Sequence, residues 1–465
     1  MAIDTPSKPE AESPSAPTIA TRPPSGAVPD RRAALARAVV AILAKTVRDE
    51  HRLTIQLDGD ADSRGEAGLA ADTAAGARVR IHGPDAVARL IFPPSPDAFA
   101  EAYLRGDIDI DGDVGAAVEA GQSLDLRRLS PTDLRRLLRF GLELRRGTPS
   151  PTPLRRVARL TGRRHSRARD LAAVRFHYDV GEDFYRLWLD RRLTYSCAYF
   201  ERPDDPAADL DAAQEAKLDL ICRKLQLGPG QRLLDIGCGW GSLIIYAAEH
   251  FGVDAVGVTL SERQASEANR RAQGAGLAER VRAEVRDYRD LGSLGTFDAV
   301  ASVGMFEHVG AANLSTYFGA AMGALAPGGL FVNHGIASAE RSRRWGGDRR
   351  RNSRFVDRYV FPDGELVPVE RAIAVARDVV GFELIDVQLL RPHYALTLRA
   401  WVERLERSWD AAVAEAGPEV ARTWRLYMSG ARIGFECGDL DVAQLLLARP
   451  PAAGPTPDRP LRPWW

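Results

Sequence analysis

The feature that most constrains the fold is an alternation of apolar strands and helices between residues 231 and 334. Short apolar segments predict strands at residues 231–236, 255–259, 281–285, 297–303 and 329–334. Segments between several of them carry helical patterns, at residues 242–250, 262–273 and 314–325. Near-continuous apolar strands that alternate with helices pair in parallel, with both faces of the sheet covered. The alternation therefore predicts an α/β fold with a mainly parallel, doubly wound sheet.

The chain has 465 residues, enough for two or three domains, and its composition changes along its length. The doubly wound domain is predicted to span residues 173–450. Residues 30–146 hold shorter helix and strand patterns and predict a small N-terminal α+β domain. One helix expected there, at residues 132–144, has apolar side chains on one side: Leu134, Leu137, Leu138 and Leu142. Proline-rich residues 1–29 and 451–465 are predicted to be tails, the first of them disordered.

Two segments are unusually rich in arginine. Residues 147–172 combine prolines with arginines and predict a basic linker between the two domains. Residues 341–354 combine arginines with Trp345. Each segment is interpreted either as a solvated charged stretch or as a surface that attracts anionic lipid headgroups.

The charge balance and the cysteines limit the classes of function. Lys and Arg together number 63, as do Asp and Glu, so the net charge gives no support for a nucleic-acid partner. The four cysteines are widely spaced without a metal-site pattern, and they predict reduced thiols in a cytoplasmic protein. No apolar run is long enough to cross a bilayer, and the N-terminus lacks a signal-peptide pattern. Any membrane contact is therefore expected to be peripheral, at the inner face.

A glycine-rich loop follows the first predicted strand, with the sequence Asp235-Ile236-Gly237-Cys238-Gly239-Trp240-Gly241. Glycines in such a turn let backbone N–H groups approach a ligand closely. Asp235 is placed to meet the ammonium group of a bound amino acid. Thr259 and Gln264, after the second strand, are expected to bind ribose, and Asp287, after the third, to accept from an adenine amino group. This pattern predicts a pocket for S-adenosylmethionine.

Six motifs, the loop among them, occur in the order found in one enzyme family. They are His177-Tyr178-Asp179-Val180-Gly181, Tyr195-Ser196-Cys197-Ala198-Tyr199-Phe200, Leu234 to Gly241, Gly257-Val258-Thr259-Leu260-Ser261, Gly304-Met305-Phe306-Glu307-His308-Val309-Gly310 and Tyr359-Val360-Phe361-Pro362-Asp363-Gly364. In these motifs the chain resembles the cyclopropane-fatty-acyl-phospholipid synthase family, a branch of the S-adenosylmethionine-dependent methyltransferases that includes synthases of methyl-branched and 10-methylene fatty acids. The resemblance runs from about residue 174 to the C-terminus and implies a Rossmann-like class I methyltransferase fold.

The resemblance also implies roles for individual residues. Beside Asp235 and Asp287, the cofactor would be bound by Tyr195, Ser196, Gly237, Gly239, Gly241, Thr259, Gln264 and Tyr288. The family also binds a bicarbonate ion, whose ligands match Cys197, Glu307, His334 and Tyr394, with backbone groups of Gly304 and Ile336. The four side chains in this set are the candidate catalytic residues, and no metal is expected.

The expected chemistry explains why such residues would be needed. A cis double bond that attacks a sulfonium methyl group becomes a carbocation, which aromatic faces stabilise and from which water must be excluded. A base must then remove a proton, and a small anion held by these side chains is one way to supply it. Other interpretations stay open for single residues: Cys197 as a small buried side chain, His334 as a core histidine and Glu307 as an acid at a helix N-terminus.

The predicted function is one-carbon transfer to the cis double bond of an unsaturated phospholipid acyl chain at the membrane surface, giving a cyclopropane. The same cation can instead lose a proton after a hydride shift and give an exocyclic methylene, which a separate reductase would turn into a methyl branch. Two alternatives are a small-amine N-methyltransferase and a lipid-binding protein without activity. The resemblance also implies a homodimer as one arrangement of the chain.

Overall fold

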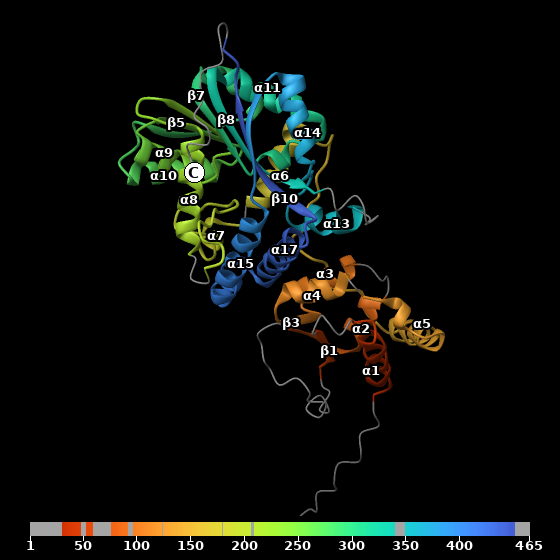
Figure 1. Cartoon of the computed structure of the whole chain (residues 1–465). Coiled ribbons are helices and arrows are strands. Elements are labelled where there is room, and N and C mark those ends of the chain that lie inside the picture. Colours follow the sequence, from red (N-terminus) through yellow and green to blue (C-terminus); the bar gives the residue numbers. More distant parts are fainter. Residues whose placement is uncertain are drawn as a thin grey trace, which may run out of the picture.

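The computed structural model describes residues 30–47, 53–58, 76–91, 96–122, 124–178, 180–205, 209–339 and 349–451. The predicted tails therefore lie outside the described residues, except for Pro451, and so does most of the arginine-rich segment 341–354. Figure 1 shows a large α/β domain and a smaller N-terminal domain beside it.

The large domain is built on a seven-stranded sheet in the order β6-β5-β4-β7-β8-β10-β9. The strands are β4 (Arg232–Ile236), β5 (Asp254–Thr259), β6 (Val281–Val285), β7 (Phe297–Val303), β8 (Leu325–Ser338), β9 (Glu383–Leu389) and β10 (Leu440–Ala448). The first five strands of this order are parallel, whereas β10 pairs antiparallel with both β8 and β9. The prediction of a mainly parallel α/β sheet is confirmed, and the last two strands had not been predicted.

Helices cover both faces of this sheet because successive strand residues point to opposite sides. Leu233 belongs to the apolar core on one face, with helices α8 (Leu210–Lys224), α9 (Ser242–Phe251) and α10 (Glu262–Gly274). Leu234 belongs to the core on the other face, with α11 (Leu314–Ala324), α14 (Val369–Ala374) and the short helix η4 (Tyr288–Leu294). The sheet is therefore doubly wound.

Further helices surround the end of the sheet where the parallel strands finish (Figure 1). They are α6 (Arg167–Tyr178), α7 (Glu182–Arg186), α13 (Arg349–Tyr359), α15 (Arg391–Arg407), α16 (Trp409–Ala416) and α17 (Pro418–Glu436). The predicted boundary between linker and main domain, at residue 172, falls inside α6. The preceding segment is tied to the large domain, since the backbone N–H groups of Arg155 and Arg156 donate to Glu419 at 3.0 and 2.8 Å.

The N-terminal domain has a three-stranded sheet with its own helices. Its strands are β1 (Leu53–Leu57), β2 (Ala77–Ile81) and β3 (Ile108–Gly112), and its helices are α1 (Arg31–Ala44), α2 (Gly83–Ile91), α3 (Pro96–Arg105), α4 (Val114–Gln122) and α5 (Pro131–Arg145). The side chain of Ser130 caps α5 by accepting a hydrogen bond from the backbone N–H of Asp133, and the side chain of Asp133 accepts one from the backbone N–H of Ser130. The predicted small α+β region is thus present.

Helix α17 joins the two domains. Arg422 donates to the carbonyl oxygens of Tyr103 and Ile108 at 3.0 and 3.1 Å, and Arg425 donates to that of Ile110 at 3.0 Å. Arg432 pairs with Asp113 at 2.7 Å. One apolar core runs through both domains without a break. The N-terminal domain therefore packs as a continuation of the large domain.

Candidate active site

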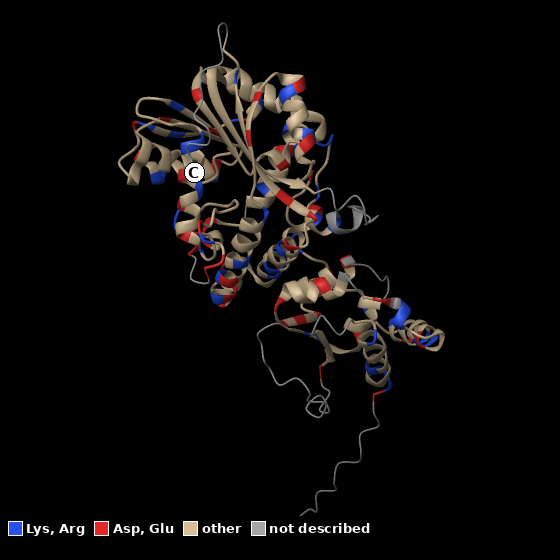
Figure 2. Ribbon diagram, in the orientation of Figure 1, with Lys and Arg blue, Asp and Glu red and all other residues tan. Residues whose placement is uncertain are grey.

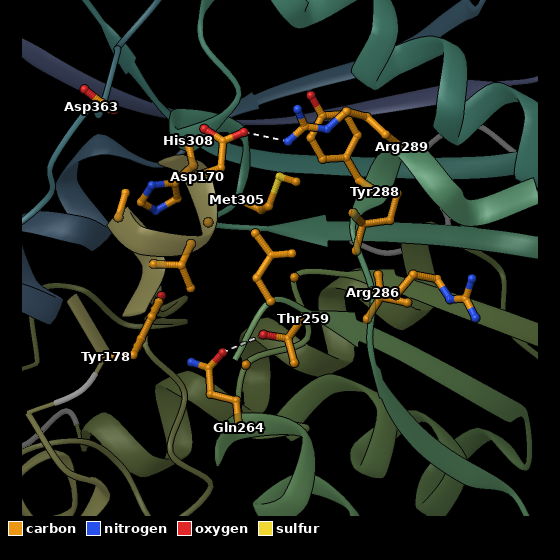
Figure 3. Close-up of a pocket in the computed structure, with 18 of the residues that line it drawn as sticks. Asp170, Tyr178, Thr259, Gln264, Arg286, Tyr288, Arg289, Met305, His308 and Asp363 are labelled. Atoms are coloured by element: carbon orange, nitrogen blue, oxygen red, sulfur yellow. Dashed lines mark hydrogen bonds and ion pairs between the residues drawn. The ribbon is translucent and has the colours of Figure 1, made fainter. Parts of the chain in front are cut away.

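A pocket opens where the parallel strands β4, β5 and β7 end (Figure 3). Five predicted cofactor-binding residues line it: Gly237, Gly239, Thr259, Gln264 and Tyr288. Gly304 and His308, from the segment after β7, line it as well. The carboxyl ends of parallel strands at a switch point of the sheet are where such folds bind their ligands.

The glycine loop requires its glycines for two different reasons. At Gly237, φ is +90°, and an added Cβ would lie 2.8 Å from the Cβ of Met305, so a side chain would close the pocket wall. The backbone N–H groups of Gly237 and Cys238 donate to Val258 at 2.8 and 3.0 Å, which holds the loop against β5. At Gly241 a Cβ would instead meet Ala268 on α10 at 2.9 Å, so that glycine permits close packing of two helices.

The polar side chains of the pocket lie on two sides. On one side, the hydroxyl of Thr259 donates to Oε1 of Gln264 at 2.8 Å, so the Gln264 amide nitrogen keeps its hydrogens for other partners (Figure 3). On the other side, Tyr288 lies beside Arg289, which pairs with Asp170 at 2.5 Å.

Asp287, predicted to accept a hydrogen bond from adenine, already has hydrogen-bond partners in the structure. Asp287 accepts from the backbone N–H and from Nε of Arg289, at 2.9 and 2.7 Å, and it does not line the pocket. Its predicted role stays a prediction. Asp170 and Arg289 line the pocket instead, and sequence reasoning missed both. Asp170 was missed because it lies in the segment interpreted as a linker.

A buried lysine that had not been predicted binds Ser196 and acts electrostatically on Asp235. Lys217 is buried and donates to Oγ of Ser196 at 2.8 Å, and burial lowers its pKa to about 8. Burial raises the pKa of Asp235 to about 7, against the attraction of Lys217, and Oδ1 of Asp235 has no partner among the described residues. The signal in the sequence was the spacing of Lys217 and Lys224, seven residues apart on an otherwise apolar side of α8.

The segment that carries Cys197 is clamped from two sides. The N–H of Ala198 donates to the hydroxyl of Thr397 on α15 at 3.0 Å, and Gln214 on α8 donates to the carbonyl of Ser196 at 2.9 Å. Cys197 is fully buried, and burial raises the pKa of its thiol. It is therefore present as a neutral S–H, held in a fixed place.

Glu307 has one satisfied and one unsatisfied oxygen. Its Oε1 accepts from the backbone N–H of Ile336 at 2.6 Å, while its buried Oε2 has no partner within the described chain. Burial raises the pKa of this carboxyl to about 7. The N–H of Gly304, for its part, donates to the carbonyl of His334 at 2.9 Å.

His334 is held by a hydrogen-bonded chain behind it. Lys224 is fully buried and donates to Oε1 of Gln444 at 2.8 Å, and Nε2 of Gln444 lies 3.1 Å from Nδ1 of His334. Because an ammonium only donates, the Gln444 amide presents its nitrogen to the histidine, and Nδ1 must accept. The proton of the neutral ring then sits on Nε2, which is buried and has no partner in the described part of the chain. Burial lowers the pKa of His334 well below its usual value, and the charges of Lys217 and Lys224 add to this effect.

Tyr394 completes the group. Its ring lies 4.7 Å from that of Phe435 and 6.0 Å from that of Trp401. Burial raises the pKa of its hydroxyl, and the charges of Tyr427, Cys197 and Glu307 raise it further. The four candidate catalytic side chains are all buried. Gly304, whose N–H donates to the carbonyl of His334, links them to the pocket that it lines.

Aromatic rings surround this region. Tyr195 lies 5.3 Å from Trp401, 5.8 Å from Trp424 and 6.3 Å from Tyr178, measured between ring centroids. Tyr427 on α17, a residue that sequence reasoning missed, lies near the hydroxyl of Tyr195. Two further aromatic residues lie elsewhere: Phe176 packs under Arg156, and Tyr359 donates to Glu101 at 2.9 Å.

Comparison with known proteins identifies the family. Residues 165–445 match the family model described as mycolic acid cyclopropane synthetase. The chain belongs to this family. It is 40% identical over 361 residues to a probable fatty acid methyltransferase of Pseudomonas putida, which covers 78% of this chain and 84% of that protein. It is 33% identical over 387 residues to the cyclopropane-fatty-acyl-phospholipid synthase of Escherichia coli strain K12, covering 82% of this chain and 91% of that protein.

Solved structures agree with this assignment. The structure of the cyclopropane synthase MmaA2 from Mycobacterium tuberculosis is similar with a TM-score of 0.57 at 34% identity, over 60% of this chain and 98% of that one. The mycolic acid cyclopropane synthase CmaA1, solved in complex with SAH and CTAB, is similar with a TM-score of 0.56 at 34% identity, over 60% and 98% of the two chains. The predicted family and its class I fold are confirmed, and the chain is an S-adenosylmethionine-dependent methyltransferase.

The pocket of this methyltransferase fits its cofactor. The cradle at Gly237 leaves room against Met305, and the amide of Gln264 and the ring of Tyr288 lie on opposite sides of the cavity (Figure 3). Ser196, bonded to Lys217, and Asp235, whose pKa Lys217 lowers, lie outside the pocket lining. No helix in the described part of the chain is both long and apolar enough to span a membrane.

Proposed function

We propose that this enzyme transfers the cofactor's methyl group to the cis double bond of an unsaturated phospholipid acyl chain and closes a cyclopropane ring. One observation carries the proposal: Oε2 of Glu307 and Nε2–H of His334 are buried and have no partner among the described residues. Polar atoms buried without partners are costly and mark a site for a polar ligand.

The surroundings suit an alkene as acceptor. The bound cofactor supplies an electrophilic methyl group on a sulfonium. The rings of Tyr195, Trp401 and Trp424 could stabilise positive charge that develops on the acyl chain, by about 2 kcal/mol or more where water is excluded. Burial of Trp401 and Trp424 keeps water from the cation.

The same residues fit a bicarbonate ion. Oε2 of Glu307 can accept from its hydroxyl group, and Nε2–H of His334 can donate to one of its oxygens. Tyr394, which is protonated, could supply a further donor, and the S–H of Cys197 could do so by turning from the carbonyl of Ala198, 3.2 Å away. The N–H groups of Gly304 and Ile336 are already bonded to His334 and Glu307, so we expect the side chains to hold the ion. Bound there, bicarbonate would supply a base near the reacting carbons.

The methylene product is the second candidate, and the names of relatives favour it. The chain is 39% identical over 392 residues to the probable fatty acid methyltransferase Rv3720 of Mycobacterium tuberculosis, and 32% identical over 381 residues to the tuberculostearic acid methyltransferase UfaA1 of the same organism. Cyclopropane and methylene products arise from the same first cation and differ in whether a hydride shift precedes the loss of a proton from the added methyl group. A methylene product would require a separate reductase to become a methyl branch.

For its location, we propose a cytoplasmic enzyme attached peripherally to the inner face of the membrane, where unsaturated phospholipids lie. The relative from Escherichia coli is named for a phospholipid substrate.

Proton NMR of the product lipid tests these proposals. The enzyme would be incubated with cofactor and vesicles of a dioleoyl phospholipid, with a dipalmitoyl phospholipid as the saturated control. Upfield ring-methylene signals would support the cyclopropane, and downfield vinylidene signals the methylene. The Glu307→Gln variant is expected to bind the cofactor and form neither product. Cofactor consumption with small amines but not with dioleoyl lipid would contradict lipid methylation.

A further inference from the structure

Helix α5 carries an apolar stripe that faces away from the protein. Leu134, Leu138 and Leu142 are 41%, 56% and 51% exposed. They are spaced by four residues and so lie on one side of the helix. The opposite side, through Leu137 and Leu144, packs against the core that α1 and α2 share. The helix therefore has its core contact already, and the leucine stripe is additional to it.

The charges beside this stripe are positive. Arg135, Arg136 and Arg139 are exposed, and none of them forms an ion pair with any residue that the structure describes. The acids of α5 are neutralised elsewhere: Asp133 pairs with Lys45 at 3.0 Å, and Glu143 pairs with Arg31. Figure 2 shows the basic residues of this helix at the outer end of the N-terminal domain, away from the seven-stranded sheet.

We propose that this face of α5, defined by the three leucines and three arginines above, docks on the surface of an anionic phospholipid bilayer. A helix that presents leucines flanked by arginines lies in the plane of the membrane interface, with its leucines among the acyl chains and its guanidinium groups at the phosphates. The proposal rests on the proposed function only in that the substrate acyl chains belong to such a bilayer.

Charge decides between this occupant and a second copy of the chain. In a two-fold dimer through this face, the arginines of both copies would gather around the paired leucines with no exposed acid of α5 to offset them. An anionic bilayer instead supplies phosphate groups opposite every guanidinium.

Vesicle flotation with the full-length enzyme tests the proposal. The probes are vesicles of dioleoylphosphatidylglycerol and vesicles of dioleoylphosphatidylcholine alone. The wild type is expected to float with the anionic vesicles, and to be released by high salt in part. Replacing the stripe by Leu134→Gln, Leu138→Gln and Leu142→Gln together should reduce that partition at least tenfold. Replacing Arg135, Arg136 and Arg139 by Gln should abolish the preference for anionic over zwitterionic vesicles.

Matched controls use exposed residues elsewhere. Leu389 and Val379 are 55% and 67% exposed, and Leu389→Gln with Val379→Gln should leave flotation unchanged. Arg263→Gln on α10 is the control for charge, and thermal unfolding checks that each variant folds. Turnover on dioleoyl lipid dispersed in detergent micelles should stay within twofold of wild type in all of them, because α5 is remote from the pocket.

The readouts separate the two proposals. If turnover on micelles is absent in the wild type while flotation follows the α5 substitutions, the proposed function fails and the docking surface stands. If the leucine and arginine variants float like the wild type, the docking surface is overturned. It is also overturned if the leucine variant changes only the oligomeric state, since the stripe would then be a contact between copies of the chain.

Discussion

Nε2 of Gln444 lies 3.1 Å from Nδ1 of His334, and Lys224 determines the orientation of the Gln444 side-chain amide. The ammonium can only donate, so the amide oxygen turns to it and the amide nitrogen turns to the ring. A buried lysine on α8 thus determines which nitrogen of a histidine on β8 carries the proton.

Gln444→Leu should remove the hydrogen bond that fixes the tautomer of His334. Without the donor, the ring can place its proton on either nitrogen, and we expect turnover to fall about tenfold, the cost of one hydrogen bond in a polar site. Nitrogen NMR of the histidine ring measures the tautomer directly. Gln388→Leu is the matched control, since Gln388 also accepts from Lys224, at 2.6 Å, without a hydrogen bond to His334. An unchanged ring spectrum in Gln444→Leu would refute the relay.

Glu307 should make stability depend on pH. Burial raises its pKa from 4.5 to about 7, so between these values the folded protein binds more protons at this site than the unfolded chain. Its contribution to the free energy of unfolding therefore falls as the pH rises from about 4.5 to about 7. Glu307→Gln should remove this fall, on the order of 3 kcal/mol. Urea unfolding at pH 5 and pH 8 measures the difference, and a variant that parallels the wild type across this range would contradict it.

Gly237→Ala should close the pocket. The new Cβ would lie 2.8 Å from that of Met305, at a φ of +90°. We expect affinity for S-adenosylhomocysteine, measured by calorimetry, to fall at least about tenfold. Gly276→Ala has the same backbone strain, at a φ of +71°, but meets no atom within 4 Å. Equal losses of affinity in the two variants would trace the effect to strain alone.

Lys217→Met should weaken cofactor binding. Ser196 loses its donor, and the pKa of Asp235 rises further because Lys217 is the group that opposes its burial. More of Asp235 is then protonated near neutral pH, and we expect affinity for S-adenosylhomocysteine to fall about tenfold at pH 7 and to recover in part at higher pH. Lys224→Met, on the same helix, should leave that affinity unchanged and lower turnover instead. Equal affinities of Lys217→Met and the wild type would remove Lys217 from the site.

Much of the fold could be predicted from the sequence because these elements follow from local residue patterns. The apolar runs that became β4, β5 and β7 and the glycines at 237 and 239 follow from residues near one another in the chain. Strands β9 and β10 were not predicted because they join the sheet by antiparallel pairing at one side, far along the chain from the parallel strands, and no local pattern indicates this pairing.

The motif residues of the site could be predicted from the sequence, whereas the buried residues that support them could not. Lys217, Lys224 and Gln444 are common surface residue types; the two lysines are buried because α8 packs on the sheet, and Gln444 because β10 lies between β8 and β9. The stripe of α5 shows the reverse: its leucines were visible in the sequence, but a pattern alone does not tell which apolar side chains face the core.

Helix α17 contacts both the surroundings of the candidate active site and the N-terminal domain. It carries Tyr427 beside Tyr195, and three of its arginines bind the N-terminal domain. The same helix therefore lies beside Tyr195 and holds the smaller domain. An orientation imposed on the N-terminal domain, as by the proposed contact with a bilayer, would reach the surroundings of Tyr195 along one continuous helix.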